Sequence, residues 1–438
     1  MSEPEIILVE KATNGLRPVP ILPLTQRVLY RGLTNLLKPN LPPLNRSKEA
    51  FSTFITAPTS LEGVEFVVVS DVAACYQFVD HSLVEEEIVN QTGEAGVARE
   101  LSELLIAITG RRFGLPQNHD PSHLLAEQVL DAVHRRLLRA GLRVWRYNDD
   151  FRLGAGTWNE AQLALEQLER HLQAVGLTLN DEKTTIKNKA GYLKSLQDPE
   201  ERWKKVQQTV AGELATFDPY TETVDLPEDA DVTSAAAIAV LDEWKENVES
   251  GVKRSGYEAQ QDRQVLMNAI WSLQILNDPE GLAYCKALIN EESSITPRVC
   301  RYMEAVAKEN TDAVVQIIDS CLEDSDSYIS GWQALWLLQS ISGETNLSTG
   351  QVEWANQLIA RNPTRAIAAQ AALALAYFGA IQEPLIAQLY NSVPEGSRPE
   401  VVAALASLVG TGTSQVLSSV IRDAPENNWI SEHYRLPF

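Results

Sequence analysis

The spacing of apolar residues divides the chain into two parts. Before residue 200, short apolar runs typical of strands alternate with stretches in which apolar residues recur every three or four positions, as in amphipathic helices. After residue 232, only the helical spacing recurs, with short polar or proline-containing turns between the segments. The pattern predicts a mixed α+β part followed by an all-helical part.

The first part is predicted to follow the order strand, helix, helix, hairpin, helix, strand. Its elements are a strand over 63–71, helices from about 82, over 121–141 and over 159–176, a strand pair within 142–156 and a strand over 177–180. Gly141 is expected to end the second of these helices, because glycine readily takes the left-handed conformation found after helices. The order resembles an antiparallel sheet with helices on one face, as in split βαβ folds.

The second part is predicted to be a series of helices. They cover 234–249, 260–277, 279–290, 297–308, 311–323, 328–342, 349–361, 364–378, 382–392, 398–410 and 413–422. From Pro297 onward they pair as helical hairpins whose first helices open about 31 to 37 residues apart. That period resembles HEAT-like repeats, in which each unit buries its apolar face on the next, and an irregular helical bundle is the alternative.

Charge separates the same two parts. The 438 residues carry 37 basic and 59 acidic side chains, a net of −22, which argues against a simple basic wrapper of nucleic acid. Residues 1–200 hold 21 basic and 26 acidic side chains, a net of −5, and residues 201–438 hold 16 and 33, a net of −17. A stretch rich in acidic residues and free of basic ones starts near 215 and predicts a solvated linker. The predicted domains are 1–214, the acidic linker 215–232 and the helical domain 233–438.

Composition and termini limit the class and the compartment. Apolar residues make up 44% and charged residues 22%, as in folded soluble proteins. Four cysteines without a C-x-x-C pair give neither a disulfide framework nor a zinc-binding spacing, so a reducing cytoplasm is expected. The N-terminus is acidic where a signal peptide needs basic residues, and no run of about eighteen uncharged apolar residues occurs. We therefore expect a cytoplasmic protein with no membrane partner.

Three carboxylates are the strongest candidates for chemistry. Asp71 ends a predicted buried strand, and Asp149 and Asp150 lie at the tip of the predicted hairpin. If the strands are neighbours, these side chains converge at one sheet edge, where they repel one another unless divalent cations neutralise them. Hard oxygen ligands suit Mg²⁺, and two such ions about 4 Å apart would activate a 3′-hydroxyl and stabilise a departing pyrophosphate. Each piece alone is also typical of an ordinary turn or cap, so the order of the motifs matters.

Five motifs, in order, resemble those of the reverse transcriptase family. They are an Arg-Pro hairpin at Arg17 and Pro18, Asp71 followed by Tyr76 in 70–87, Gly-Leu-Pro-Gln in 114–133, Tyr-Asn-Asp-Asp in 146–151 and Gly-Leu-Thr-Leu-Asn with Lys183 in 176–184. The resemblance covers roughly residues 10–190. It implies an α+β polymerase fingers and palm, an antiparallel sheet with helices on one face, followed here by the all-α, HEAT-like repeat domain.

The resemblance assigns a catalytic role to four residues. Asp71 and Asp149 would ligate two Mg²⁺ ions, with Mn²⁺ as an alternative, and Asp150 would complete the cluster or hold a neighbouring ligand. Lys183 would protonate or screen the pyrophosphate leaving group, or else be a surface lysine.

Four further residues would bind the nucleotide. Arg17 would grip the incoming triphosphate, because a guanidinium forks onto phosphate oxygens, and Lys11 would add a point charge nearby. Tyr76 would lie beneath the sugar and exclude a 2′-hydroxyl, and Gln117 would position the template or the nucleotide base. A solvated charge, a core aromatic and a helix-entry residue are the plain structural interpretations of Arg17, Tyr76 and Gln117.

The chain also departs from the family pattern. The glycine that follows the glutamine in the family motif is Asn118 here, a bulkier residue where the backbone approaches the template strand. His119 and His123 lie four residues apart, but Pro121 stands between them and no third ligand follows, so no metal site is predicted there. The Leu-Ala-Glu form of 125–127, the compact fingers and the helical second half look most like bacterial abortive-infection and defence-associated reverse transcriptases.

These observations lead to one main hypothesis and three alternatives. The main hypothesis is a Mg²⁺-dependent DNA polymerase of reverse transcriptase type in bacterial antiphage defence, which adds dNTPs to a nucleic-acid or protein primer. The alternatives are template-independent or protein-primed DNA synthesis, a ribonucleotide polymerase, and a silent scaffold whose helical repeats bind a partner. Expected partners are dNTPs and RNA or DNA as template or product; a noncoding RNA, a partner protein and a second copy of the chain are further candidates.

Overall fold

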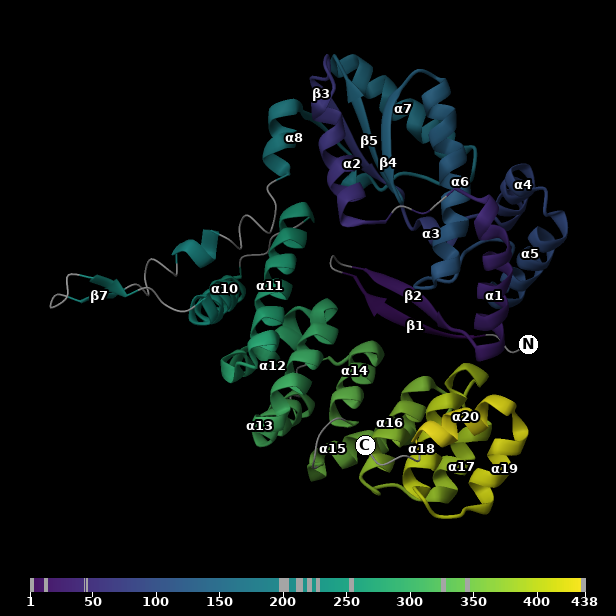
Figure 1. Cartoon of the computed structure of the whole chain (residues 1–438), viewed down its shortest axis with the longest axis vertical. Helices are drawn as coiled ribbons and strands as arrows, with labels where there is room; N and C mark the ends of the chain where they lie inside the picture. The colour runs from purple at the N-terminus through teal and green to yellow at the C-terminus, as the bar shows by residue number, and fades with distance from the viewer. Residues whose placement is uncertain are drawn as a thin grey trace. The chain divides into compact units, whose positions relative to one another are not determined.

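Two compact units make up the chain in this computed structural model (Figure 1). The structure describes residues 4–11, 15–42, 44, 46–196, 205–209, 216–218, 223–225, 229–251, 256–323, 328–342 and 347–434. The first unit consists of Met1–Pro4 and Leu22–Gln197, and the second of Glu5–Ile21 and Asp198–Phe438. The N-terminal hairpin is therefore part of the second unit, together with the helical half of the chain.

The first unit is built on a four-stranded antiparallel sheet with the order β4-β5-β3-β6. Its elements are α1 (Leu24–Leu37), η1 (Lys38–Asn40), α2 (Lys48–Ser60), β3 (Phe66–Asp71), α3 (Cys75–Phe78), α4 (His81–Thr92), α5 (Ala95–Thr109), α6 (Asp120–Arg139), β4 (Arg143–Tyr147), β5 (Asp150–Ala155), α7 (Trp158–Gln173), η2 (Asp181–Lys183), β6 (Thr185–Asn188) and α8 (Lys189–Ser195). The predicted strands 63–71 and 142–156 and the three predicted helices are confirmed.

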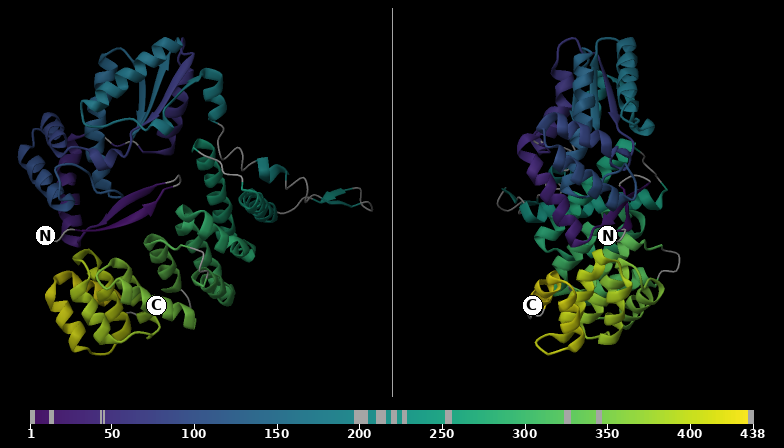
Figure 2. Two further views of the ribbon diagram at one scale, coloured as in Figure 1. Left: turned by 180° about the vertical axis from the view of Figure 1, so that it is seen from behind. Right: turned by 90° about the vertical axis from the view of Figure 1, so that its right-hand side faces the viewer.

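Helices lie on both faces of this sheet, whereas the sequence predicted them on one face (Figure 2). Val68 and Leu153 are buried on the face that α6 and α7 cover. On the opposite face, Val67 packs with Tyr192 of α8, and the Arg152 guanidinium lies 4.9 Å from the ring centre of Phe54 in α2. Tyr192 is the one buried residue of α8, so this short helix has no amphipathic pattern that periodicity could detect.

The last predicted strand, over 177–180, is wrong. Leu177 and Leu179 alternate with polar residues and are buried, as in a strand, but this segment makes only an isolated bridge between Leu179 and Val72. The fourth strand is β6 instead, which pairs with β3 at the edge of the sheet. None of its four residues is buried, so the apolar alternation that marks a strand is missing.

In its described residues, the second unit is helical apart from two small hairpins. Its elements are β1 (Glu5–Glu10), β2 (Leu16–Ile21), β7 (Thr216–Asp218), β8 (Thr223–Asp225), α10 (Asp229–Glu249), α11 (Gly256–Leu276), η3 (Pro279–Gly281), α12 (Leu282–Glu291), η4 (Ser293–Ile295), α13 (Thr296–Leu322), α14 (Gly331–Ser342), α15 (Thr349–Arg361), α16 (Ala366–Tyr377), α17 (Glu383–Ser392), η5 (Glu395–Ser397), α18 (Arg398–Val409), α19 (Gln415–Asp423) and α20 (Pro425–Tyr434). The helical second half is thus confirmed, while the HEAT-like repeat remains a prediction.

The predicted break between the helices 297–308 and 311–323 is confirmed, because α13 joins two helices across a kink at Asn310, where φ is −133° and ψ is 37°. One other detail differs from the expectation. Helix α20 was not predicted, because its sequence, PENNWISEHY, is mostly polar. The predicted acidic linker 215–232 lies partly outside the described residues; within it, β7 pairs with β8 and α10 begins at Asp229.

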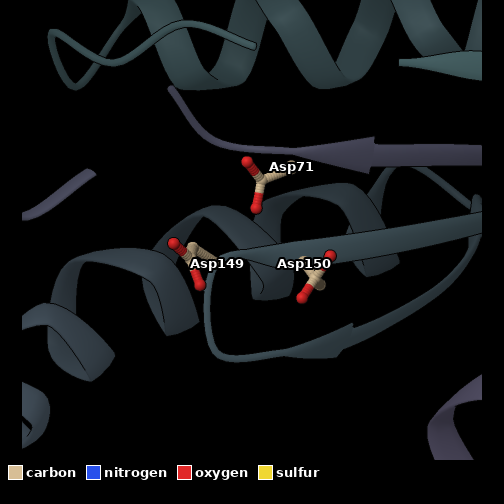
Figure 3. A group of neighbouring side chains, drawn as sticks. All are labelled: Asp71, Asp149 and Asp150. Carbon is tan, nitrogen blue, oxygen red and sulfur yellow. The ribbon is translucent and has the colours of Figure 1, made fainter. Parts of the chain in front are cut away.

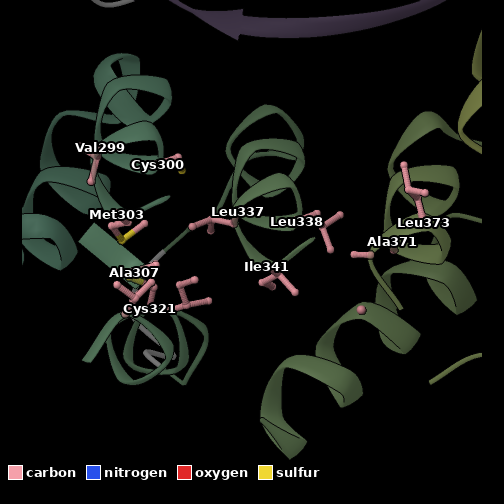
Figure 4. Packing of buried hydrophobic residues seen from close by; sticks show 14 of the residues in the cluster. Val299, Cys300, Met303, Ala307, Cys321, Leu337, Leu338, Ile341, Ala371 and Leu373 are labelled. Atoms are coloured by element: carbon pink, nitrogen blue, oxygen red, sulfur yellow. The ribbon is translucent and has the colours of Figure 1, made fainter. Parts of the chain in front are cut away.

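A continuous apolar core joins these helices (Figure 4). Val299 and Met303 of α13 and Leu337 and Leu338 of α14 are fully buried in it, and Ala371 of α16 continues it. All four cysteines are free and buried, three of them in this core. Within the described residues, no helix is long and apolar enough to cross a membrane.

The hairpin of β1 and β2 is built into the helical unit. The Glu5 carboxylate accepts a hydrogen bond from the backbone N–H of Ala366 (2.7 Å) and so caps the N-terminus of α16. A side chain at Gly396 would place its Cβ 2.5 Å from the carbonyl oxygen of Ile21, so only glycine fits beside the end of β2. These contacts tie the hairpin to α16 and η5.

Candidate active site

Strand pairing brings the three candidate carboxylates together. Asp71, the last residue of β3, pairs with Asp150, the first residue of β5, and Asp149 lies in the two-residue turn between β4 and β5. One carboxylate oxygen of each lies within 4.8 Å of those of the other two, and Figure 3 shows the side chains gathered at this end of the strands. Asn148 begins the turn with φ of 53°, a left-handed conformation that asparagine tolerates better than most residues.

The proximity of the acids changes their proton affinity. Burial raises the pKa of Asp149, and the charge of Asp71 adds to this effect. Burial also raises the pKa of Asp150 to about 7, although the Arg152 guanidinium, 3.7 Å away, acts in the opposite direction. The Lys183 ammonium lies 3.0 Å from Asp71, whose side chain is 13% exposed, and so offsets part of the negative charge.

The residues present fit a divalent cation. Three carboxylates offer hard oxygen donors at mutual distances that one ion or a pair of ions can bridge. Burial raises the pKa of Asp149 most, and the repulsion from Asp71, which adds to this effect, is what a bound cation would relieve. Among the described residues, Asp71, Asp149 and Asp150 are the group of at least three His, Cys, Asp or Glu side chains whose ligand atoms lie close enough together to hold a metal ion.

An ion pair beneath the turn supports Asp149. Arg146 of β4 forms a fork onto both carboxylate oxygens of Glu127 in α6, and the two side chains are only 6% and 19% exposed. Nη1 of Arg146 also donates to the carbonyl oxygen of Asn148 (2.8 Å), the residue before Asp149. The pair therefore links the helix α6 to the backbone of the turn. Sequence reasoning missed both roles, because nothing in the spacing of residues 127 and 146 signals that they meet.

Tyr76 lies in the one-turn helix α3, close behind β3. Its hydroxyl contacts Nη2 of Arg46 (2.8 Å) and Nδ1 of His123 (2.7 Å). Burial raises the pKa of Tyr76 to about 12; Arg46 opposes this shift and Asp149 adds to it, so the hydroxyl lies in the electrostatic field of the acidic cluster. Arg46 and His123 are further residues that the sequence motifs did not assign.

The loop before α6 holds Gln117 in a half-buried position. The Ser122 hydroxyl fixes this loop, because it donates to the carbonyl oxygen of Pro116 (2.5 Å) and contacts the buried Tyr30 hydroxyl (2.8 Å). Asn118 has φ of 62°, in the left-handed region that glycine would occupy most easily. The replacement of the family glycine thus keeps the backbone conformation.

Lys11 and Arg17 belong to the other unit. Both are exposed in the N-terminal hairpin, Lys11 just after β1 and Arg17 on β2. The backbone N–H of Lys11 donates to the carbonyl oxygen of Gly15 (3.0 Å) and closes the hairpin loop. The first unit by itself brings together the three carboxylates and Lys183, with Tyr76 in the field of the cluster.

An antiparallel sheet that carries a cluster of carboxylates at one end of its central strands has the ligand groups that metal-dependent phosphoryl transfer needs. Comparison of the chain with known protein families gives a match to one family. Residues 9–209 match the family model described as reverse transcriptase (RNA-dependent DNA polymerase). Residues 9–209, just under half of the chain, are thus a domain of the reverse transcriptase family, an RNA-directed DNA polymerase domain of the nucleotidyltransferase class.

Two solved structures that the comparison matches are telomerases. One is telomerase from Candida albicans in complex with the TWJ fragment of telomeric RNA, at 13% identity and a TM-score of 0.30, with 74% of this chain and 64% of that chain covered. The other is apo telomerase from Candida tropicalis, at 12% identity and a TM-score of 0.32, with 100% and 68% covered. The chain thus spans less than two thirds of the first of these. No curated protein matches it.

Proposed function

We propose that the chain is a Mg²⁺-dependent DNA polymerase of reverse transcriptase type that adds deoxynucleotides to a nucleic-acid or protein primer. The observation that carries this proposal is the cluster of Asp71, Asp149 and Asp150, whose ligand oxygens lie within 4.8 Å of one another. A domain without catalysis has no reason to keep three mutually repelling acids together. RNA, DNA or both would serve as template and product.

The three carboxylates would hold two Mg²⁺ ions, with Mn²⁺ as an alternative, and the ions would lower the pKa of the primer hydroxyl and stabilise charge on the departing pyrophosphate. Asp149 sits on a turn whose backbone is fixed by Arg146, so its carboxylate is held in place before substrate binds. Lys183, at 3.0 Å from Asp71 and half exposed, would donate a proton to the pyrophosphate or offset its charge.

Four side chains would bind the incoming nucleotide. Arg17 and Lys11, on the exposed hairpin, would contact the triphosphate, and Gln117 would position a base. Tyr76 would lie beneath the sugar and reject ribonucleotides. Its half-buried ring and its place in the field of Asp149 support this role.

Template-independent or protein-primed synthesis is a second candidate. The observation that favours it is Asn118, whose exposed side chain stands where the family has a bare glycine backbone beside the template.

The experiment that tests both candidates is incorporation of labelled dNTPs with Mg²⁺ by purified protein. It is run with an RNA template and DNA primer, with primer alone and with neither, and the Asp149→Asn/Asp150→Asn variant serves as the blank. Product that requires RNA supports reverse transcription. Product without RNA, retained on the protein after denaturation, supports protein priming. Activity absent from every arm would leave the domain as a scaffold for a partner bound by the helical unit.

For the cellular role, we propose bacterial antiphage defence. The support is the Leu-Ala-Glu form of residues 125–127 and the helical second half, which resemble those of defence-associated relatives. HEAT-like packing of α13 to α18 would then offer a surface for a noncoding RNA, a partner protein or a second copy. Phage plating on cells that carry the wild-type chain or Asp149→Asn tests this role, and equal plating on both would contradict it.

A further inference from the structure

The hydroxyl of Tyr76 is tied to two elements that are distant in sequence. Arg46, just before α2, donates to the hydroxyl oxygen at 2.8 Å. Nδ1 of His123, in the first turn of α6, lies 2.7 Å from the same oxygen. Because the hydroxyl carries a single proton and Arg46 already donates to its oxygen, that proton is available to the His123 ring.

His123 also contacts the ring of Tyr76. The two ring centres are 5.6 Å apart and the planes are perpendicular, at 89°, an edge-to-face arrangement. The tyrosine ring is only half buried, so packing alone leaves room for another rotamer of its side chain. Two polar contacts at the tip and one aromatic contact at the side are what fix its direction.

The helix turn that presents His123 is itself firmly held. Its neighbour Ser122 is buried and bonded to Pro116 and Tyr30, and Pro121 at the start of α6 has the backbone angle that a first helical turn needs. His123 is therefore a rigid support rather than a mobile surface histidine. This contact with Tyr76 gives His123 a structural partner, in line with the expectation that it does not form a metal site with His119.

We propose that His123 is a specificity-determining residue of the polymerase, which acts by holding Tyr76 in the orientation that excludes a 2′-hydroxyl. The inference rests on the proposed function and on the role of Tyr76 in it. A side chain that excludes an atom by its bulk has to keep its position. A shift of about 1 Å in a positioned group is enough to change the rate of a reaction up to 100-fold. Loss of the anchor at the hydroxyl lets the ring turn aside, so ribonucleotides enter more easily.

The test is a double-mutant cycle on sugar selection. The ratio of kcat/KM for dATP to that for ATP is measured in Tyr76→Phe, His123→Ala and the double variant, with Tyr76→Ala as the reference for a missing gate. We expect the ratio to fall about ten-fold in each single variant. The effects of the two single changes should be clearly less than additive in the double variant, since both remove the hydrogen bond between Tyr76 and His123. His123→Asn, whose amide takes the place of Nδ1, should restore most of the ratio.

Controls separate the outcomes. His171→Ala, on α7 and away from Tyr76, should leave the ratio unchanged. If Tyr76→Ala keeps the wild-type ratio, the gate itself is wrong and the inference falls with it. If Tyr76→Ala lowers the ratio while His123→Ala does not, or if the two single effects add, the gate stands and the role of His123 is overturned. If the wild-type protein incorporates no nucleotide, the proposed function fails. The role of His123 is then tested by the ratio of the dissociation constants for ATP and dATP in the same variants. Equal ratios in wild type and His123→Ala overturn the inference.

Discussion

At the scale of single residues, Asn118 replaces a glycine of the family motif while the backbone of the loop keeps its conformation. A left-handed backbone costs most residues about 1 to 2 kcal/mol, but asparagine adopts it more readily than most other residues. With φ of 62°, Asn118 keeps the conformation that the family glycine provides. The bulk of its side chain is exposed, so it changes the surface that the template would meet and not the fold.

We predict opposite outcomes for two changes at this position. Asn118→Gly should keep the fold and use an RNA template at least as well as wild type. Asn118→Val should lose about 1 to 2 kcal/mol of unfolding free energy, because a β-branched residue is strained at positive φ. Urea denaturation with a template-dependent incorporation assay checks both, and equal stability of the Val variant would contradict the conformational argument.

The carboxylates give a prediction on pH. The pKa of Asp150 is raised to about 7 in the folded chain, while an unfolded aspartate titrates near 4, so only the folded state holds this proton between about pH 4 and pH 7. The free energy of unfolding of metal-free protein therefore falls as pH rises through this window. The Asp150→Asn variant should not show this fall in the free energy of unfolding, because its side chain does not titrate.

In EDTA, the Tm of Asp150→Asn minus that of wild type should grow between pH 5 and pH 8. Addition of Mg²⁺ at pH 8 should raise the Tm of wild type more than that of the variant. A difference in Tm that shrinks with rising pH would mean that the acid is not strained in the fold.

Motif order located Asp71, Asp149 and Asp150, because Asp71 ends a short strand, Asp150 begins another and Asp149 lies in the turn just before it. The partners of these residues could not be predicted in the same way. Glu127, Arg146, His123 and Arg46 act through contacts between elements, and such contacts depend on how helices cross a sheet rather than on spacing along the chain.

At the scale of elements, α6 organises the site. It contributes His123 to Tyr76 and Glu127 to the turn of Asp149, two residues about one helical turn apart on the same side of the helix. The sequence predicted this helix within two residues at either end, because its apolar face is long and regular. Strand β6 and helix α20 were missed for the opposite reason, since both present few apolar residues.

The ion pair under the turn should be costly to break. Glu127→Ala leaves the Arg146 guanidinium buried without its partner, and we expect a loss of roughly 3 to 5 kcal/mol. Glu127→Gln keeps one hydrogen bond and should lose less, while kcat falls in both variants as the turn loosens. Urea unfolding beside steady-state kinetics measures this, with Glu166→Gln, in the exposed pair with Arg170, as the control expected to lose less than about 1 kcal/mol. Equal losses in Glu127→Ala and the control would refute the role of burial.

At the scale of the whole molecule, the chain is divided differently from its sequence pattern. Composition marks a change near 215, and a solvated linker there is a natural expectation. The compact units instead separate at Gln197 and Asp198, and they assign the N-terminal hairpin to the helical unit. Composition could not reveal this, because the hairpin joins its unit through contacts over 360 residues apart in sequence, such as Glu5 to Ala366.

The attachment of the hairpin can be tested at Gly396. Gly396→Ala would set a Cβ 2.5 Å from the backbone oxygen of Ile21, so the strand must shift, and we expect a loss of about 1 to 3 kcal/mol. Gly350→Ala, inside α15 with ordinary contact distances, should be neutral or stabilising. Thermal unfolding of both variants gives the comparison, and a harmless Gly396→Ala would show that β2 does not rest on η5.

The central claim is that Asp71 and Asp149 carry out DNA synthesis. The most direct measurement is the rate of dNTP incorporation with Mg²⁺ on the best template and primer, for Asp71→Asn, Asp149→Asn and Glu182→Gln, with folding checked by thermal unfolding. Glu182 is exposed in η2, next to Lys183, and lies outside the cluster. We predict that each Asp variant loses about 10³-fold or more while Glu182→Gln stays within about two-fold of wild type. Folded Asp71→Asn and Asp149→Asn proteins that keep the wild-type rate would contradict the account.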